Sequence, residues 1–420
     1  MIKTITVLPG ITLRCLRDDR FKQNLLSIQF YTPATRENIP ANALLPEVLL
    51  RGCQGAEDLR KITLRLDDLY GAAVGPMVRR IGDYHSTGLS CGFIEDRFAM
   101  EPEGILAPMV AFLKQLFLCP LTEKGAFRAD FVAGEKTNLI AAIEARRNDK
   151  RAYANGQLLR HMCRADSFGI PRLGDKEQVE AITPESLFAY YQKVLRTAPV
   201  ELFYVGTGEP ERIAGLVKDL FQDVDRDYVN LPVQTPYQPS PEGSYEEKMD
   251  VAQGKLCMGF VSPVTMRDPE FVAYQLLNLI LGGGMTSKLF MQVREKMSLC
   301  YDISSGYHGS KGILTVSAGI DFDKKDLVQE QILAQLEACA RGEITPEELA
   351  AARQAMRTGL LSTYDSPGAM ESYYATSYLG GFGMDPREHM KKVEQVTAEE
   401  ISAAAKKLRL HTVFFLKGEQ

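Results

Sequence analysis

The chain of 420 residues repeats part of itself, and this repetition limits the folds that it can adopt. The segment VEAITPESLFAYYQKVLRTAPVELFYVG (179–206) has a counterpart in VEQVTAEEISAAAKKLRLHTVFFLKG (393–418). Each segment has a Thr-x-Glu helix start, an apolar-periodic helix and a closing apolar strand. Weaker echoes, in the same order along the chain, place Tyr70 opposite Tyr301. We therefore predict two copies of one fold.

Within each half, strands are mixed with long helices, which favours an α+β fold with an antiparallel-rich sheet covered by helices on one face. A chain of this length also exceeds the size at which a single core usually stops growing. Residues 227–247 are rich in proline and lack periodicity, so we expect a semi-extended linker there. The predicted domains are residues 1–226 and residues 248–420.

Charge and composition exclude several classes of partner. The net charge is −5 and no Lys/Arg block is interleaved with aromatic residues, so nucleic acid is not expected. The sequence contains no apolar run of 18 residues that would span a membrane. Arg14, Arg17, Asp18 and Asp19 follow too early for the apolar core of a secretory signal, and the 8 cysteines are scattered. We expect a cytoplasmic protein.

Three motifs that could carry chemistry fail on context. GLSCG (88–92) has the spacing of a nucleophile elbow, but it lies in an alternating run that is typical of a strand. LGGGMTSK (281–288) lacks the Gly-Lys order of a phosphate-binding loop, and its glycines are typical of a helix end. The 5 histidines are too far apart for two of them to share one helical zinc motif.

The stretch LGGGMTSKLFMQVREKMSLCYDISS (281–305) resembles the second-half signature of the pitrilysin/insulinase family of zinc peptidases, which includes the mitochondrial processing peptidase. Arg294 and Tyr301 fit the spacing of the family's Arg and Tyr. The resemblance extends over nearly the whole chain and implies two duplicated α+β domains. It also implies that Arg294 and Tyr301 bind the substrate and the developing oxyanion beside zinc. The glycine turn, Gly282, Gly283 and Gly284, is expected to bind substrate.

The same resemblance implies a zinc motif H-x-x-E-H in the first half, and the matching helix is NALLPEVLLRGC (42–53). Its two histidine positions hold Ala43 and Glu47, and its general-base position holds Pro46. On the downstream helix, the third ligand position corresponds to Ala142, with Glu144 as a rival candidate. An accessory carboxylate remains at Glu135. We expect neither a metal nor another cofactor in this chain, and zinc only in a partner subunit.

The expected function is that of a non-catalytic subunit of a heterodimeric zinc peptidase. Such a subunit would bind a peptide or an unfolded protein in an inter-domain chamber. It would supply Arg294 and Tyr301 in trans to a homologous partner that carries H-x-x-E-H. Two alternatives stay open: a pseudo-peptidase that binds peptides or proteins without a role in cleavage, and a structural or regulatory scaffold, which could form a homodimer. An active peptidase with an unusual metal site is disfavoured by the histidine spacing.

Overall fold

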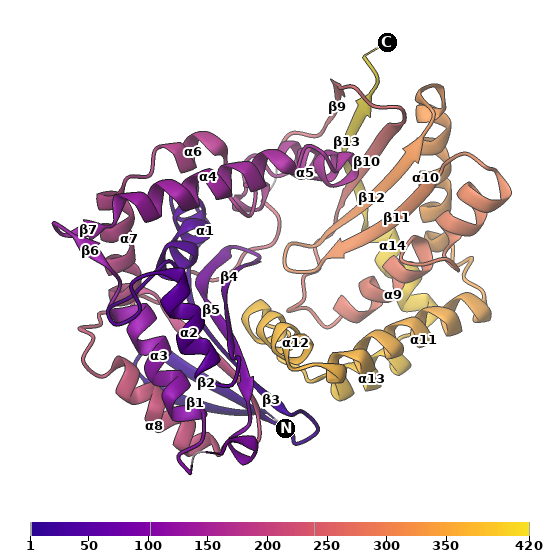
Figure 1. The fold of residues 1–420 in the computed structure, drawn as a ribbon. Helices are drawn as coiled ribbons and strands as arrows, with labels where there is room; N and C mark the ends of the chain where they lie inside the picture. The colour runs from indigo at the N-terminus through magenta and orange to yellow at the C-terminus, as the bar shows by residue number, and fades with distance from the viewer. Residues whose placement is uncertain (1, 101, 239, 420) are drawn as a thin grey trace. The chain divides into compact units, whose positions relative to one another are not determined.

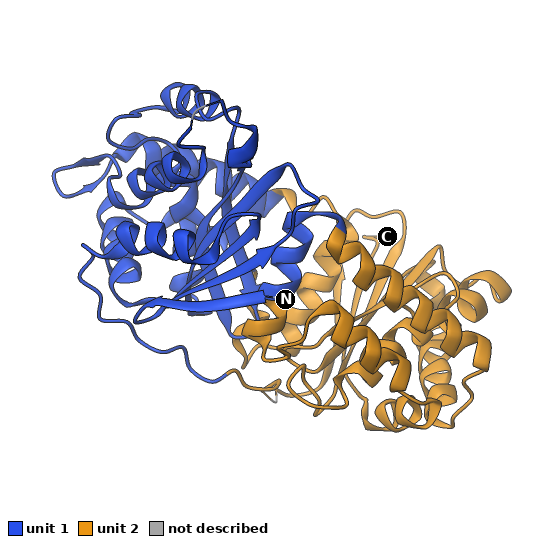
Figure 2. Ribbon diagram, turned by 90° about the horizontal axis from the view of Figure 1, so that it is seen from below, with its two compact units in different colours: residues 1–144, 172–233, 365–375 blue, residues 145–171, 234–364, 376–420 orange. Residues whose placement is uncertain are grey.

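The computed structural model describes residues 2–100, 102–238 and 240–419, which form two compact units. Unit 1 comprises residues 1–144, 172–233 and 365–375, and unit 2 comprises residues 145–171, 234–364 and 376–420 (Figure 2). Each unit therefore contains one segment from the other half of the sequence. The division into residues 1–226, a linker and residues 248–420 stays a prediction about the duplicated halves.

Unit 1 is built on a six-stranded sheet with the order β1-β2-β8-β3-β5-β4 (Figure 1). Its strands are β1 (Ile2–Leu8), β2 (Ile11–Arg17), β3 (Gln23–Pro33), β4 (Ala73–Ile81), β5 (Tyr84–Ile94) and β8 (Val200–Gly206). A short hairpin, β6 (Thr122–Glu123) and β7 (Ala126–Phe127), lies apart from this sheet. Its helices are α1 (Asn38–Leu49), α2 (Leu59–Asp67), α3 (Leu106–Leu118), α4 (Ala129–Ala145), α6 (Lys176–Glu180), α7 (Pro184–Thr197) and α8 (Pro210–Phe221).

Unit 2 is built on a five-stranded sheet with the order β11-β12-β10-β13-β9. Its strands are β9 (Gly243–Lys248), β10 (Gly254–Val261), β11 (Asp302–His308), β12 (Ile313–Ile320) and β13 (Arg409–Lys417). Its helices are α5 (Lys150–Met162), α9 (Phe271–Leu281), a π-helix (Leu289–Lys296), α10 (Lys325–Ala340), α11 (Pro346–Ser362), α13 (Pro386–Gln395) and α14 (Ala398–Lys407). Helix α12 (Pro367–Gly380) begins in unit 1 and ends in unit 2.

Five strands of the unit 1 sheet, all except β1, have the topology of the five-stranded sheet of unit 2. In unit 1, β3 is antiparallel to both β5 and β8, and β8 is parallel to β2. In unit 2, β10 is antiparallel to both β12 and β13, and β13 is parallel to β9. The hairpin of β4 and β5 corresponds to the hairpin of β11 and β12. This agreement confirms the predicted α+β fold with two copies of one architecture.

The faces of the unit 1 sheet differ because successive residues of a strand point to opposite sides. On β3, Leu26 and Ile28 belong to the hydrophobic core shared with the helices on that side. Ser27 and Gln29 donate hydrogen bonds from the other face to the Glu371 carboxylate, at 2.9 and 3.0 Å. Glu371 lies on α12, so a helix from the second half of the sequence covers part of this face.

The sheet of unit 2 receives a helix from the first half of the sequence. Helix α5 packs on β10 and β13 through Ala154 and Leu158, which form one cluster with Cys257 and Phe414. The sequence predicted helices on one face of each sheet; the structure adds α5 and the start of α12, which meet residues of the opposite half. In chain order, α5 and α12 hold equivalent places in the two copies.

Buried polar contacts fix the chain after α5. Lys311 and Asp166 form an ion pair at 3.0 Å, and their side chains are 0% and 1% exposed. Asp166 also accepts hydrogen bonds from the backbone N–H groups of Phe168, at 2.8 Å, and Gln238, at 3.0 Å. The second part of the predicted linker is therefore bonded to unit 2. Pro239, within that linker, lies outside the described residues.

Candidate functional site

Helix α1 carries the three positions of the predicted zinc motif. Ala43 is 3% exposed, Pro46 is buried inside the helix, and Glu47 is half-buried. Pro46 offers no acid or base, because its ring carries no titratable group. The middle position of the motif is thus filled by a side chain that packs and cannot activate water.

A cavity of about 370 Å³ in unit 2 and another of about 540 Å³ in unit 1 contain most of the predicted site residues. The cavity in unit 1, which we call the vacated-site cavity, lies among α1, β4, α4 and residues 172–173. Its lining consists of Ala43, Glu47, Pro76, Met77, Val78, Arg79, Glu135, Asn138, Leu139, Ala142, Arg172 and Leu173. The structure therefore brings Ala43, Glu47 and Ala142 together, whereas Pro46 is not part of the lining.

The rival ligand position does not belong to this cavity. Glu144 forms an exposed ion pair with Lys176, at 2.6 Å. Glu135 lines the cavity and is 7% exposed. Its carboxylate accepts hydrogen bonds from Arg51, at 3.3 Å, and from Asn138, at 3.0 Å.

The carboxyl groups of the vacated-site cavity have different surroundings. Burial, followed by the nearby charge of Glu135, raises the pKa of Glu47 above its ordinary value. His85 lies on β5. Its Nδ1 atom contacts the Asn42 side chain at 3.1 Å, and its Nε2 atom contacts the carbonyl of Arg172 at 2.9 Å. Burial lowers the pKa of His85 to about 4, so this ring is neutral at pH 7.

Zinc does not fit these residues. A zinc site in a protein uses three or four nitrogen, sulfur or oxygen ligands. The cavity offers the carboxylates of Glu47 and Glu135, and the second is already engaged by Arg51. Across residues 2–100, 102–238 and 240–419, no group of three or more His, Cys, Asp or Glu side chains is arranged to hold a metal ion.

The second cavity, in unit 2, is lined by the predicted Arg and Tyr. Arg294 lies on the π-helix and Tyr301 directly precedes β11; between them, Ser298 adopts φ +53°, which turns the chain back. The Nε–H of Arg294 donates to the carbonyl of Tyr301 at 2.9 Å. Both side chains line this cavity with Ser298, Asp321 and Lys324.

The polar groups of Arg294 and Tyr301 have partners within unit 2. The Tyr301 hydroxyl donates to Asp321 at 2.9 Å, and this hydrogen bond to a carboxylate raises the pKa of the phenol. Arg294 donates to Glu295 at 2.8 Å and lies over the ring of Phe290. Tyr301 is nevertheless 54% exposed, so its ring is accessible from solvent.

The glycine turn has a structural role at two of its three positions. A Cβ atom on Gly282 would lie 2.9 Å from the backbone N of Ser305, and one on Gly283 would lie 2.9 Å from Cα of Leu279. A Cβ atom on Gly284 would meet nothing within 4 Å. The carbonyl of Gly282 accepts a hydrogen bond from Ser305 of β11.

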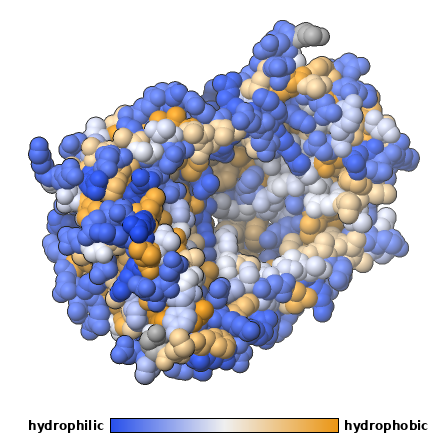
Figure 3. Space-filling view, viewed as in Figure 1, coloured by the Kyte–Doolittle hydropathy of each residue, from blue (hydrophilic) through white to orange (hydrophobic). Residues whose placement is uncertain are grey.

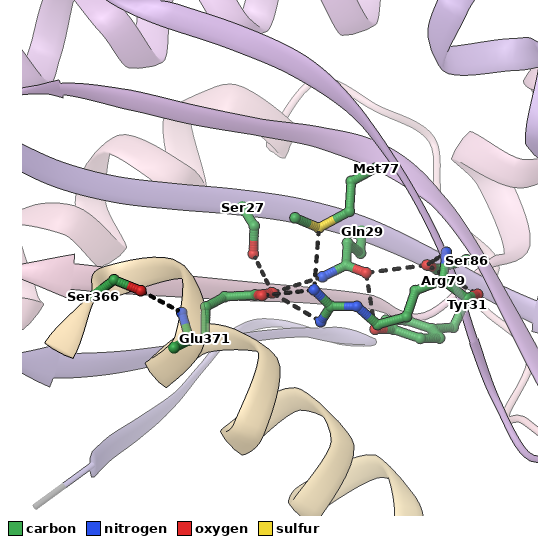
Figure 4. Close-up of polar contacts among 9 residues, drawn as sticks. Ser27, Gln29, Tyr31, Met77, Arg79, Ser86, Ser366 and Glu371 are labelled. Atoms are coloured by element: carbon green, nitrogen blue, oxygen red, sulfur yellow. Dashed lines mark hydrogen bonds and ion pairs between the residues drawn. The ribbon is translucent and has the colours of Figure 1, made fainter. Parts of the chain in front are cut away.

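Sequence analysis missed the polar network around Glu371 on the face of β3 that carries Ser27 and Gln29, drawn in Figure 4. Arg79 of β4 donates two hydrogen bonds to Glu371 of α12, at 3.1 and 2.7 Å. Ser27 and Gln29 bond the same carboxylate. Since Arg79 also lines the vacated-site cavity, one wall of that cavity is tied to a residue from the far end of the chain.

The surface seen in Figure 3 is mostly hydrophilic, with smaller hydrophobic areas between. Among the helices of the described residues, none combines the length and the apolar character needed to cross a membrane.

Comparison with known proteins identifies relatives over the whole chain. Residues 181–356 match the family model described as Peptidase M16 inactive domain. The chain is 28% identical over 411 residues to the probable inactive metalloprotease YmfF of Bacillus subtilis, covering 98% of this chain and 96% of that protein. It is 26% identical over 252 residues to the uncharacterized zinc protease YmxG of Bacillus subtilis, covering 58% of this chain and 59% of that protein.

Solved structures agree with these matches. A conserved protein from Enterococcus faecalis superposes with a TM-score of 0.93 at 29% identity, covering 100% of this chain and 99% of that chain. A peptidase M16 inactive domain from Pseudomonas fluorescens shares the fold, with a TM-score of 0.81 at 17% identity, covering 100% of this chain and 98% of that chain. The chain is therefore similar to peptidase M16 proteins, as the sequence resemblance predicted, and its residues 181–356 match the family model of the inactive domain.

Proposed function

We propose that this chain is a non-catalytic subunit of a heterodimeric zinc peptidase of the cytoplasm. It binds a peptide or an unfolded protein in an inter-domain chamber. A homologous partner with H-x-x-E-H supplies the zinc and the general base, and this chain supplies Arg294 and Tyr301 to that zinc site in trans.

The vacated-site cavity is the observation that carries the proposal. Ala43, Glu47 and Ala142 occupy the ligand positions that the family resemblance implies, and they line one cavity without forming a metal-ligand set. This arrangement supports a site that keeps its framework without metal chemistry. A subunit with this framework is useful for holding a polypeptide chain near another subunit's metal.

The cavity of Arg294 and Tyr301 supports the second half of the proposal. A fixed guanidinium and a phenol hydroxyl can stabilise negative charge that develops on a carbonyl oxygen during peptide hydrolysis. Arg294 is anchored to the backbone of Tyr301, so the two side chains are positioned together. A bound carbonyl oxygen would have to replace Asp321 as the acceptor of the Tyr301 hydroxyl.

The internal partners of these residues favour a second candidate, a peptide- or protein-binding pseudo-peptidase or scaffold without a role in cleavage. Asp321 and Glu295 already bond the Tyr301 hydroxyl and the Arg294 guanidinium. In this candidate the two residues stabilise the turn before β11, and the chain functions with its client alone or as a homodimer.

Reconstitution with an H-x-x-E-H partner distinguishes the two. If Arg294 and Tyr301 act in trans, Arg294→Ala and Tyr301→Phe each lower kcat/KM for a peptide substrate by roughly a hundredfold, because an oxyanion donor is lost. Lys296→Ala is the matched control, since Lys296 is exposed on the same π-helix and does not line the cavity. Size-exclusion chromatography establishes that each complex still assembles.

Unchanged turnover of both variants in an assembled complex would exclude the trans role and leave the second candidate. A wild-type chain that hydrolyses the peptide without any partner would contradict both candidates.

A further inference from the structure

A further cavity, of about 290 Å³, lies within unit 2 and shares no lining residue with the cavity of Arg294 and Tyr301. We call it the hydroxyl cavity, because serine and threonine residues make up half of its lining. Helix α5 contributes Asn155 and Leu159 to it. The hairpin of β11 and β12 contributes the other residues, among them Ser304, Gly306, Thr315 and Ser317.

The two strands of this hairpin place polar groups on one face of the sheet. In the antiparallel register of β11 and β12, Ser304 lies opposite Ser317 and Gly306 lies opposite Thr315. Residues two apart on a strand point to the same side, so these two cross-strand pairs share a face. Helix α5 also packs on β12. The hydroxyl cavity is therefore the space between this helix and the hairpin.

Gly306 leaves the middle of the cavity open. A Cβ atom at this position would meet only the Thr315 hydroxyl oxygen, at 3.7 Å, which is an ordinary contact. The register of β11 and β12 continues through Gly306 without a bulge, and its backbone lies outside the left-handed region. A glycine weakens a strand, and where neither a bulge nor a bend requires it, it often marks the close approach of a ligand.

The hydroxyl cavity is uncharged at neutral pH along its described lining. Its one titratable lining residue is His308, and burial lowers the pKa of this ring below its ordinary value. Arg151, which donates a hydrogen bond to Ser304, lies outside the lining and 3.8 Å from the Asp302 carboxylate. An ion in the cavity would lose hydration without gaining a countercharge, so the lining favours a neutral polar ligand.

Three lining residues offer hydrogen bonds to such a ligand. The Ser304 hydroxyl accepts a hydrogen bond from Arg151, and the Ser317 hydroxyl accepts one from the Cys257 thiol at 3.7 Å, so each serine keeps its own proton to donate. The side-chain nitrogen of Asn155 donates to the backbone carbonyl of Arg151 at 3.1 Å. Its side-chain oxygen accepts no hydrogen bond from the segments that the structure describes. The cavity thus presents two donors and one acceptor.

We propose that the hydroxyl cavity binds the side-chain carboxamide of a glutamine residue in a bound polypeptide. The Ser304 and Ser317 hydroxyls donate to the carboxamide oxygen, and the Asn155 oxygen accepts from the carboxamide nitrogen. The methylene stem packs against Leu159, and the space beside Gly306 admits it. The inference rests on the proposed function in one respect, that this chain binds polypeptides. It adds a preference for a neutral amide side chain and assigns it to unit 2.

Fluorescence anisotropy with the full chain tests the preference directly. The probes are fluorescein-labelled heptapeptides of the form Ala-Val-Ser-Xaa-Ser-Val-Ala, in which Xaa is glutamine, glutamate or norleucine. Glutamate keeps the shape of glutamine and adds a charge, whereas norleucine keeps the stem and removes the polar group. The glutamine peptide is expected to bind roughly ten- to thirtyfold more tightly than either of the others, as two hydrogen bonds between neutral groups provide.

Two variants assign the preference to the hydroxyl cavity. Gly306→Val fills the open space with a side chain that suits a strand, and it is expected to bring the affinities for the glutamine and norleucine peptides together. Asn155→Ala removes the acceptor and should reduce the preference by roughly three- to tenfold. Asn148→Ala is the matched control, because Asn148 is exposed before α5 and does not line the cavity; it keeps the full preference. Circular dichroism at increasing temperature confirms that all three variants are folded.

Equal affinities of the wild-type chain for glutamine and norleucine peptides would overturn this inference and leave the proposed function intact. A glutamate peptide that binds as tightly as the glutamine peptide, or a full preference in both Gly306→Val and Asn155→Ala, would overturn it as well. Failure of every peptide to bind would overturn both the inference and the peptide-binding part of the proposed function.

Discussion

Arg79 and Glu371 form a bidentate ion pair in unit 1, although 292 residues separate them in the sequence. The side chain of Glu371 is 1% exposed, and that of Arg79 is 19% exposed. Ser27 and Gln29 donate two further hydrogen bonds to the Glu371 carboxylate, so both Arg79 and neutral donors stabilise this buried charge. Removal of one partner would leave the other charge in a partly dehydrated position.

We therefore expect Glu371→Ala to lower the free energy of unfolding by roughly 3–5 kcal/mol, the usual effect of breaking a buried pair from one side. Urea unfolding followed by circular dichroism measures this. Glu57→Ala removes one partner of an exposed pair with Lys61 and serves as the control, with little change expected. A variant at Glu371 as stable as wild type would contradict the importance of the network.

The wild-type chain is expected to bind no stoichiometric zinc, because the ligand positions hold Ala43, Glu47 and Ala142. Introducing the family's ligand residues at these positions tests whether the cavity has the geometry of a zinc site. The combined variant Ala43→His, Pro46→Glu, Glu47→His and Ala142→Glu should bind one zinc per chain, since the three ligand positions 43, 47 and 142 line one cavity. Elemental analysis after dialysis measures the content. Zinc in the wild type that is lost in Glu47→Ala would contradict the prediction.

The stability of the chain should fall in mild acid because of His85. Its pKa in the folded chain is about 4, below the ordinary value of 6.5, so the unfolded chain takes up the proton first. The contribution of neutral His85 to the free energy of unfolding is fully present above about pH 6.5. It is lost as the pH falls towards 4, which lowers the stability by up to about 3 kcal/mol.

The measurement compares urea unfolding at pH 7 and pH 4.5 for the wild type and for His85→Gln. The variant lacks the titrating ring, so the stability difference between the two pH values should shrink by about 2–3 kcal/mol. His389, whose pKa burial also lowers to about 4, remains in both proteins and does not affect the comparison. An identical pH dependence of the two proteins would count against the assignment to His85.

The glycine turn provides a matched pair of substitutions. Gly282→Ala forces a Cβ atom against the backbone N of Ser305 and should cost roughly 1–3 kcal/mol, as overpacking does. Gly284→Ala meets no neighbour and should leave the thermal midpoint nearly unchanged. Thermal unfolding by circular dichroism compares them. Equal destabilisation by both would show that the close approach at Gly282 has no energetic effect.

The duplication could be predicted because local signals repeat. Thr183 and Thr397 each accept a hydrogen bond from the N–H group three residues on, and each starts a helix that leads into the strand beside the central one. Capping residues and apolar periodicity act within a few residues, so they are readable in a single sequence.

The packing of α5 and of the start of α12 against residues of the opposite half of the sequence could not be predicted in this way. An amphipathic helix reports that one of its faces is buried, but not which sheet buries it. The partners of Glu371 are chosen by long-range packing, and neither Arg79 nor Glu371 has a local signature. The π-helical turns of Leu289–Lys296 are likewise set by packing, since the segment has an ordinary helical composition.

The candidate site was accessible to sequence analysis only through the family resemblance. Ala43 and Ala142 are unremarkable residues by composition, and their shared cavity depends on how α1, β4 and α4 meet. The same holds for Asp321, which bonds Tyr301 from the end of the neighbouring strand. The spacing of residues along the sequence predicted which of them share a helix. The contacts between different helices and strands could be identified only in the structure.

The membership of residues 365–375 in unit 1 has a consequence for biosynthesis. Domains generally fold in order as the ribosome releases them. Here the first unit lacks Glu371 until nearly all of the 420 residues have been translated, and Arg79 has no carboxylate partner in this network before then. The N-terminal half, residues 1–226, therefore lacks this carboxylate while the ribosome adds residues 227–370.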